Sequence, residues 1–466
     1  MEIMIPLDSQ LPSPLYEQIY RYLKEEIRRG RLQAGSRLPS TRVLAQNLKV
    51  SRSTTQMAYE QLLSEGYIEA APCRGYFVCK IEELVEVKQK PSGAFVEEGQ
   101  ENAPAFQVDF SPRGIDLDSF PFNTWRKLSR NTLVDDNKDM FFAGDPQGER
   151  SLRTAIGDYL HSARGVNCSP EQLVIGAGSE YLLMLLSQLL GRNTTIAMEN
   201  PTYKQAYRVL KGQGHPVVPV KMDRYGMDPG ELASSGADTA YVMPSHQYPT
   251  GIVMPVKRRQ ELLGWAYGGE NRYVIEDDYD SEFRYKGKPI PALQGMDGGG
   301  RVIYVGTFSK SIAPAIRVGF MVLPQQLVKA YREKAGFYAC TVPRIDQNIL
   351  YQFITEGYYE RHLNRMRAIY KGKHDVLLNG LKALEGRFSI NGEFAGLHVL
   401  LRHRHGLSEK ELVERAAMSG VRVYGMSDSF IHPEHNVYPS TVMLGYARLD
   451  EKQIELGCRL LKEAWL

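Results

Sequence analysis

The spacing of apolar residues predicts three helices and a hairpin in the first 80 residues. Apolar positions recur at helical spacing in residues 14–30, in 41–48 and from Ser51 to about Glu65. The second and third of these helices each follow a serine that can cap the first turn. The short runs at 67–69 and 76–78 then predict two strands joined by a turn. Helix, helix, turn, helix and hairpin is the order of elements in a winged helix-turn-helix.

The rest of the chain alternates helical patterns with short apolar runs. These runs lie at residues 173–175, 195–198, 240–243, 273–275 and 302–305. Apolar strands separated by helices indicate an α/β fold with a doubly wound, mostly parallel sheet that is covered on both faces. Residues 81–105 are instead rich in Glu, Lys, Gln, Pro and Gly, which predicts a linker that is flexible at least in part. We therefore expect a winged helix-turn-helix at 1–80, a linker at 81–105 and an α/β domain at 106–466.

Composition and charge narrow the class of protein. The chain has 43% hydrophobic and 24% charged residues, as ordinary globular proteins do. No apolar run approaches the roughly 20 residues that cross a bilayer, and the N-terminus lacks the features of a signal peptide, so we expect a cytoplasmic protein. Its five cysteines are scattered and lack metal-ligand spacing, which predicts reduced thiols and no metal site. The net charge of +3 lies in residues 1–80, which hold 11 Lys and Arg against 8 Asp and Glu. This excess of positive charge indicates that residues 1–80 are the part of the chain that could bind the phosphate backbone of a nucleic acid.

The third predicted helix begins with residues suited to nucleic acid. Ser51 to Gln56 offer short hydroxyls, one Arg and one Gln, which can contact phosphates and base edges. Arg74 lies at the tip of the predicted wing. The alternative is a solvated helix end in a small protein-interaction domain. The run 35–78 closely resembles the DNA-binding domain of the GntR family of bacterial regulators, which implies paired heads on repeated half-sites of a double-stranded operator. The resemblance implies DNA contacts from Arg37, Ser40, Arg42, Arg52, Thr54, Thr55 and Gly75.

Lys310 follows an apolar strand, and its neighbours in other motifs suggest chemistry. A lysine near a strand end can be kept neutral and form a Schiff base with an aldehyde, although a lone lysine after a serine is usually a surface residue. Pyridoxal phosphate (PLP) also needs a carboxylate at its pyridinium nitrogen, a donor to its phenolate, an aromatic ring on its face and a phosphate site. Residues 276–280 and 199–203 offer the first three of these groups, and a glycine-rich turn at 176–180 with Arg317 offers the last.

Six ordered motifs resemble a fold-type I aminotransferase of class I/II. They are DPQGERSLRTAIGDYL at 145–160, GAGSE at 176–180, ENPTY at 199–203, PTG at 249–251, EDDYDSEFRY at 276–285 and TFSKSIAPAIRVGF at 307–320. The resemblance implies a smaller C-terminal α+β subdomain and Lys310 as the Schiff-base lysine. It implies that Asp277 partners the pyridine nitrogen, that Tyr279 reaches the phenolic oxygen and that Tyr203 stacks on the ring, where core packing is the alternative role for Tyr203. Phosphate contacts are implied for Gly178, Ser179, Thr307 and Arg317. We expect Asp278 and Asp280 to be turn or solvated residues.

Two stretches depart from the aminotransferase pattern. Many such enzymes have Asn before the Pro-Thr-Gly, where it helps to hold the ring phenolate, but this chain has Tyr248. His246, Gln247 or Tyr279 would have to compensate. Enzymes of this fold often place an Arg near the C-terminus to grip the substrate carboxylate, and Met443 stands at that place here. The candidates to supply that charge are Arg402, Arg422 and Arg448. If none does, an ordinary α-amino acid would be a poor ligand.

A GntR-type head fused to a class I/II aminotransferase-like domain resembles the MocR subfamily of regulators. We expect a homodimeric, PLP-dependent transcription regulator that binds DNA. It would sense an amine, an amino acid, a dipeptide or PLP itself through an internal aldimine on Lys310. Residual aminotransferase-type chemistry is compatible with this role. One alternative is a catalytically active aminotransferase that carries a DNA-binding head, and another is a PLP-free regulator that keeps the fold only as a dimerisation platform.

Overall fold

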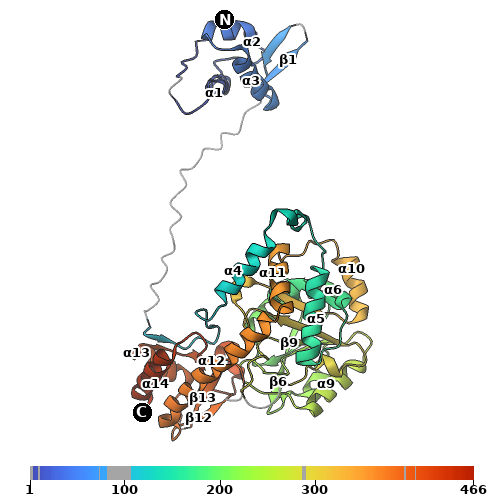
Figure 1. Cartoon of the computed structure of the whole chain (residues 1–466), viewed down its shortest axis with the longest axis vertical. Helices are drawn as coiled ribbons and strands as arrows, with labels where there is room; N and C mark the ends of the chain where they lie inside the picture. Colours follow the sequence, from blue (N-terminus) through green and yellow to red (C-terminus); the bar gives the residue numbers. More distant parts are fainter. Residues whose placement is uncertain are drawn as a thin grey trace. The chain divides into compact units, whose positions relative to one another are not determined.

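The chain forms two compact units, Met1–Asn102 and Ala103–Leu466, which we call the head unit and the effector unit (Figure 1). The computed structural model describes residues 4–8, 11–72, 74–80, 106–285, 290–392, 395–404 and 406–466. The linker expected at 81–105 lies outside the described residues, so its extent stays a prediction. Within the described ranges, the helices are all too short or too polar to cross a membrane.

The head unit is a winged helix-turn-helix with a hydrophobic core of its own. Its elements are α1 (Leu15–Arg28), α2 (Thr41–Leu48), α3 (Arg52–Ser64), β1 (Ile68–Ala71) and β2 (Gly75–Val78). Both expected caps are present: the Ser40 hydroxyl accepts from the Val43 amide at 3.2 Å, and the Ser51 hydroxyl accepts from the Thr54 amide at 3.1 Å. The strands β1 and β2 pair antiparallel as the wing. The predicted fold of the head is confirmed.

An eight-stranded sheet forms the centre of the effector unit. Its strands are β4 (Leu173–Gly176), β5 (Ile196–Asn200), β6 (Val217–Asp223), β7 (Gly226–Met227), β8 (Thr239–Val242), β9 (Tyr273–Asp278), β10 (Val302–Thr307) and β11 (Gly319–Val322). They lie in the order β4-β11-β10-β9-β8-β5-β6-β7, and the run from β10 to β6 is parallel. Strands β11 and β7 run antiparallel to their neighbours. The five apolar runs in the sequence correspond to β4, β5, β8, β9 and β10, which confirms a mostly parallel sheet.

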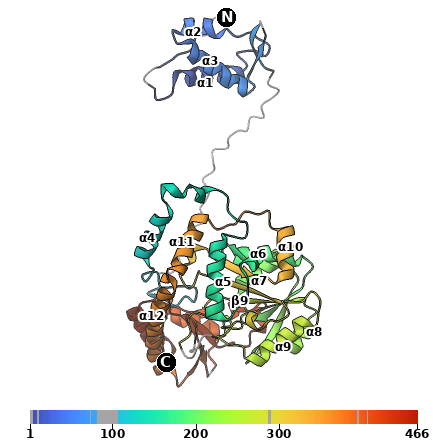
Figure 2. The same cartoon turned by 45° about the vertical axis from the view of Figure 1, so that its right-hand side comes forward.

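Helices cover both faces of this sheet (Figures 1 and 2). One face packs against α6 (Ser179–Leu190), α7 (Lys204–Gly212) and α10 (Gln325–Lys334). The other face packs against α5 (Arg150–Arg164), α8 (Pro229–Ser234), α9 (Val256–Tyr267) and α11 (Arg344–Thr355). Helix α4 (Phe122–Thr132) lies against α11, and the long α12 (Tyr358–Leu381) leads into the C-terminal subdomain. Strand ends at one edge of such a sheet commonly hold the ligand site.

The C-terminal subdomain is α+β, as expected. Its antiparallel sheet has the order β12-β13-β16-β15 and consists of β12 (Phe388–Asn391), β13 (His398–His403), β16 (Thr441–Gly445) and β15 (Tyr424–Gly425). Helices α13 (Glu409–Met418) and α14 (Glu451–Trp465) complete its core. A separate pair joins β14 (Val421–Arg422) in parallel with β3 (Val108–Asp109). The first strand of the effector unit therefore packs into the last part of the chain.

Residues 111–114, which we call the strap, follow β3 and are fixed at both ends. Before the strap, the Phe110 carbonyl accepts from the Gly445 amide at 2.9 Å. After it, Asp116 forms a buried ion pair with Lys373 at 2.8 Å, and the same Lys373 amine donates to the Ala447 carbonyl at 2.9 Å. A Cβ at Gly445 would lie 2.3 Å from the Ser111 carbonyl oxygen, so the strap packs directly on β16.

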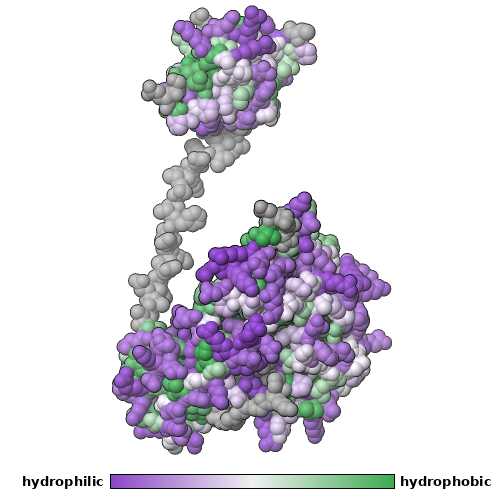
Figure 3. Space-filling view, in the orientation of Figure 1, coloured by the Kyte–Doolittle hydropathy of each residue, from purple (hydrophilic) through white to green (hydrophobic). Residues whose placement is uncertain are grey.

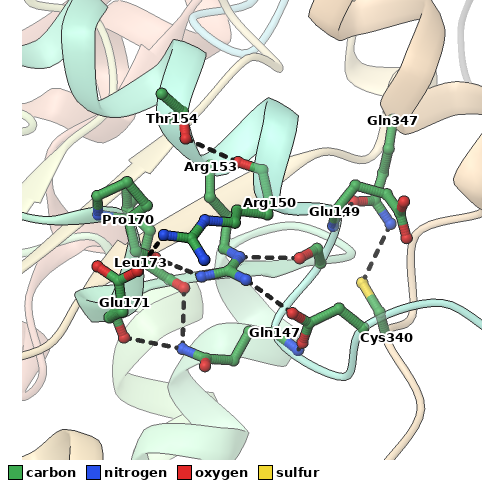
Figure 4. Close-up of polar contacts among 12 residues, drawn as sticks. Gln147, Glu149, Arg150, Arg153, Thr154, Pro170, Glu171, Leu173, Cys340 and Gln347 are labelled. Carbon is green, nitrogen blue, oxygen red and sulfur yellow. Dashed lines mark hydrogen bonds and ion pairs between the residues drawn. The ribbon is translucent and has the colours of Figure 1, made fainter.

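The motif at 145–160 supports the sheet (Figure 4). The buried Arg153 side chain donates through Nε to the Gly148 carbonyl at 2.8 Å and through Nη2 to Asp145 at 2.7 Å. The Gln147 carbonyl accepts from the Ile175 amide in β4 at 2.8 Å. These contacts fix β4, and with it the glycine-rich turn that follows.

Candidate functional site

A cavity of about 210 Å³ opens where β9, β10 and the start of α6 meet. It is lined by Pro112, Arg113, Ser179, Glu180, Tyr203, Met243, Tyr248, Asp277, Tyr279, Asp280, Thr307, Ser309, Lys310, Pro314, Arg317, Leu397 and His398. Most of the residues implied for PLP are therefore brought together. Among the described residues, Gly178 and His246 are the two predicted cofactor residues that do not line the cavity.

The Lys310 amine points at the strap. Its Nζ donates to the Pro112 carbonyl at 3.1 Å and to the Arg113 carbonyl at 3.0 Å. Burial lowers the pKa of Lys310 to about 8, and the Arg113 charge acts in the same direction. A larger share of this amine than of an ordinary lysine is therefore neutral and nucleophilic near neutral pH.

Asp277 is a buried acid at the end of β9. Burial raises its pKa to about 7, even though the Tyr241 hydroxyl donates to the carboxylate. A cation beside it, such as a protonated pyridine nitrogen, would return the carboxyl to its ionised form. Tyr241 was not predicted from the sequence, although it lies one residue before the end of β8, where a strand delivers side chains to this edge.

Tyr279 and Asp280 of the cavity wall form a polar cluster with His246, which lies behind them. The Tyr279 hydroxyl lies 3.1 Å from His246 Nδ1, and the same nitrogen lies 3.0 Å from Asp280 Oδ2. His246 Nε2 is buried and has no hydrogen-bond partner among the described residues. His246 thus lies against Tyr279 instead of standing in the cavity.

The expectation that Asp278 and Asp280 are turn or solvated residues is wrong for Asp278, which is buried in β9. Asp280 does begin a turn, in which its carbonyl accepts from the Phe283 amide at 3.0 Å, but its side chain is buried and not solvated. Arg164 of α5 donates to Asp278 through Nε at 2.9 Å and forms an ion pair with it through Nη2 at 2.8 Å. The Tyr304 hydroxyl adds a hydrogen bond to Asp278 at 2.6 Å. Strand β9 continues through Asp278, so the charge enters the interior, where a distant arginine compensates it.

The start of α6 and Arg317 form a cradle of positive potential. Gly178 precedes the helix with φ +91°, and Arg317 Nη2 donates to the Ala177 carbonyl at 3.0 Å and to Glu180 at 2.9 Å. A Cβ on Gly178 would lie 2.5 Å from Arg317 Nη2, so only glycine fits this turn without displacing the guanidinium. Across from it, the Thr307 hydroxyl lies 2.8 Å from that of Ser309. A helix start with a guanidinium and hydroxyls is suited to bind a phosphate.

The structure shows which residues form the aromatic wall of the cavity and what surrounds Met443, where an arginine was expected. Tyr203 lines the cavity, with its ring edge-on to Tyr248 at 5.9 Å between centroids. Met443 is buried in an apolar cluster with Leu400 and Met426, next to Tyr248. In the described part of the chain, none of the three candidates to replace the arginine near Met443 lines the cavity, namely Arg402, Arg422 and Arg448. Arg113, which no motif contains, lines it instead.

In the head unit, six of the predicted DNA contacts are exposed or half-buried at the starts of α2 and α3 and on the wing. They are Arg37, Ser40, Arg42, Arg52, Thr54 and Arg74. Gly75 lies beside Arg37, since a Cβ there would be 3.2 Å from the arginine Nε. Thr55 differs: its side chain is fully buried, and its hydroxyl donates to the Thr41 carbonyl at 2.9 Å. This burial comes from packing between α2 and α3, and we remove Thr55 from the DNA-contact set.

Comparison with known proteins agrees with both units. The family model "Aminotransferase class I and II" matches residues 116–460, and "Bacterial regulatory proteins, gntR family" matches residues 15–78. The HTH-type transcriptional regulator YhdI of Bacillus subtilis is 42% identical, with 100% of this chain and 98% of that protein covered. The probable rhizopine catabolism regulatory protein MocR of Rhizobium meliloti is 32% identical, with 99% and 96% covered. Pyrococcus horikoshii kynurenine aminotransferase, solved in complex with PMP, superposes with a TM-score of 0.69 at 26% identity, with 77% of this chain and 90% of that chain covered.

The aminotransferase class I and II fold implies dependence on PLP, and the gntR match implies that the head unit binds operator DNA. With relatives matched over their whole length, the chain belongs to the MocR subfamily of GntR-type transcription regulators, in which a winged helix-turn-helix is joined to an aminotransferase-like domain.

Proposed function

We propose that Lys310 holds PLP in the effector unit and that the state of this site controls how the head unit binds its operator. The observation that carries the proposal is the convergence of a buried amine, a buried acid and an anion cradle on one cavity of about 210 Å³. The ligand would be an amine, an amino acid, a dipeptide or PLP. Because operator DNA is the second partner, we place this function in the cytoplasm.

The residues present fit PLP on chemical grounds. When bound, PLP supplies an aldehyde that condenses with a primary amine with loss of water. The pKa of Lys310, about 8, gives a neutral fraction at pH 7 that is roughly 300-fold larger than for a lysine at 10.5. Asp277, whose pKa is raised to about 7 by burial, gains a charge partner in a protonated pyridine nitrogen. These two groups would fix the ends of the ring.

The remaining contacts follow from the cavity walls. Gly178, Ser179, Thr307 and Arg317 would hold the phosphate, which would take the place of Glu180 at the guanidinium. Tyr203 would face the ring, and the Tyr279 hydroxyl would donate to the phenolate oxygen. His246 would act through Tyr279, because its Nδ1 lies 3.1 Å from that hydroxyl. This arrangement would compensate for the Tyr248 that replaces the usual asparagine.

The strap offers a route from the pocket towards the linker. A Lys310 nitrogen held in a covalent bond has fewer N–H groups, so it cannot keep both of its hydrogen bonds to the Pro112 and Arg113 carbonyls. The strap would therefore be held differently when Lys310 is free and when it is engaged. In the chain, residues 81–105 are followed by β3 and then by the strap. A change in the strap would therefore occur next to the segment that joins the effector unit to the head unit. A ligand shifts this equilibrium only if it binds one arrangement better than the other.

The head contacts and the dimer complete the proposal. Arginines 37, 42, 52 and 74 would meet phosphates or base edges, with Ser40, Thr54 and the Gly75 backbone beside them. A homodimer would present two heads to repeated half-sites. The effector unit exposes large apolar side chains on a mostly hydrophilic surface (Figure 3), which supports pairing with a second copy. Those on α4 and on the segment that follows it, up to the end of a short 3-10 helix, are Phe122, Leu133, Val134, Phe141 and Phe142.

The test is spectroscopic and uses the full chain. After reconstitution with PLP, the wild type should show a visible absorption band that Lys310→Ala lacks and that the exposed-surface control Lys329→Ala keeps. DNA binding would be measured at fixed salt with duplexes selected by the wild type from a random pool. A colourless wild type would contradict the proposal. Amino acid turnover on the order of 1–10³ per second would favour the alternative of an active aminotransferase.

A further inference from the structure

Arg113 is the one cation of the cavity wall without a partner among the described residues. The other two cations of the wall are engaged: Lys310 donates to two carbonyls, and Arg317 pairs with Glu180 at 2.9 Å. The Arg113 guanidinium makes no hydrogen bond or ion pair with any described side chain or carbonyl, and its side chain lines the cavity. Arg113 is exposed, so its guanidinium is free to bind an anion that enters the cavity beside the Lys310 amine.

The carboxylates of the cavity wall do not meet this need. Asp277 accepts from Tyr241, and Asp280 lies 3.0 Å from His246 Nδ1. Glu180 pairs with Arg317. Each acid that lines the cavity is thus already engaged, and the anion for Arg113 would have to come from solution.

The charge of Arg113 acts on three different walls of the cavity. It helps to lower the pKa of Lys310, after the larger effect of burial. Burial raises the pKa of Tyr248 to about 12 and also raises that of Tyr203, and the Arg113 charge opposes both increases. Arg113, Lys310, Tyr203 and Tyr248 all line this cavity, so the charge lies in the same space as the three groups on which it acts.

The wall that would otherwise hold a substrate carboxylate is apolar. Met443 is 2% exposed and packs with Leu400 and Met426, and Tyr248 covers this cluster on the cavity side. Leu397 lines the cavity near the same sheet. An anionic ligand group would lose its hydration without compensation beside the apolar Met443 cluster. Beside Arg113 it would instead gain an opposite charge.

We propose that Arg113 binds the carboxylate of the effector, which is therefore a primary amine that carries a carboxylate and not a simple amine. A guanidinium presents paired N–H donors that match a carboxylate, and such charge-assisted bonds are among the strongest in proteins. The inference rests on the proposed function, because it assigns the ligand of the same pocket. It replaces the arginine expected near Met443 with one from the strap.

This placement joins ligand recognition to the strap. The Arg113 side chain would hold the ligand, while its own carbonyl accepts from the Lys310 amine at 3.0 Å. When Lys310 no longer donates to the backbone carbonyls of the strap, a carboxylate ligand would hold the strap through the Arg113 side chain instead. An amine without a carboxylate would leave the strap without this second contact.

The experiment compares β-alanine with propylamine, which have similar length but differ in the carboxylate. Each is titrated into the PLP-loaded full chain at fixed ionic strength, and the change in visible absorption gives its affinity. The wild type should bind β-alanine more tightly by roughly 10- to 100-fold, as expected for a hydrogen-bonded charge. Arg113→Gln should abolish this preference, and Arg113→Lys should keep part of it, since a point charge remains.

Arg448→Gln is the matched control. Arg448 packs beside the strap, where a Cβ on Gly114 would lie 2.6 Å from the Arg448 Cβ, yet in the described chain it does not line the cavity. This variant should keep the full preference for β-alanine. The inference is overturned if the wild type does not prefer β-alanine, or if the preference survives in Arg113→Gln. It is also overturned if Arg113→Gln no longer binds PLP, because Arg113 would then serve the cofactor. A wild type without a PLP band would instead count against the proposed function itself.

Discussion

Replacing Gly178 with alanine should weaken PLP binding, because the new methyl group would displace Arg317. The added Cβ would lie 2.5 Å from Arg317 Nη2 and 2.9 Å from Cζ, well inside van der Waals contact. Gly178 also has φ +91° and ψ 172°, a conformation that costs an L-residue on the order of 1–3 kcal/mol. If the displaced guanidinium loses its hydrogen bond to the phosphate, about 1.5–3 kcal/mol is lost. The affinity for PLP should then fall by roughly 10- to 100-fold.

Gly191→Ala separates the two effects. Gly191 lies at the other end of α6 with φ +87° and ψ 146°, and a Cβ there would meet no heavy atom within 4 Å. Both variants should lose similar stability in urea unfolding, because both strain the backbone in the same region. Only Gly178→Ala should lose affinity when PLP is titrated and its visible absorption is followed. Equal PLP affinities in the two variants would refute the assignment of this turn to the phosphate.

Three further predictions concern buried groups. Thr55→Val removes the hydroxyl that donates to the Thr41 carbonyl, so the free energy of unfolding of the head, measured by thermal unfolding, should fall by about 1 kcal/mol. The folded head should keep its affinity for DNA. Weaker DNA binding would mean that Thr55 belongs to the contact surface after all. Asp278→Asn leaves the charge of Arg164 without its buried partner and should destabilise the effector unit by about 3–5 kcal/mol. If thermal unfolding of this variant gave an unchanged Tm, the ion pair would not be important for stability. Because the neutral amine of Lys310 reacts and its pKa is about 8, PLP incorporation followed by stopped-flow absorbance should accelerate with pH up to about 8 and then level off. A rate that keeps rising towards pH 10 would argue against the lowered pKa.

Much of the cavity could be predicted from sequence because its motifs follow strands. Asp277 is the residue before the last one in β9, Thr307 ends β10, and Ser179 begins α6 after the short turn that follows β4. The carboxyl ends of parallel strands meet at one edge of a sheet, so local patterns were enough to predict that these side chains converge. The predicted caps at Ser40 and Ser51 also depended only on neighbouring residues, and both are present.

What the sequence left undetermined depends on contacts between distant segments. Arg113 is 197 residues from Lys310, and Arg164 is 114 residues from Asp278, so no spacing pattern links the members of either pair. Thr54 and Thr55 follow each other on one helix, and packing against α2 decides that Thr55 points inward. Burial of this kind is a property of the assembled tertiary structure.

The pairing of β3 with β14 has a consequence for how the chain is synthesised. Tyr424, whose hydroxyl donates to Asp109 at 2.9 Å, is 315 residues further along the chain. The head unit, with a core of its own, is thus complete on the ribosome long before the partner of β3 has been translated. A premature stop codon before Val421 should release a protein that has a folded helix-turn-helix but lacks the strand that anchors the strap. We expect nonsense alleles that end the chain after the head unit but before Val421 to bind DNA without answering to any ligand.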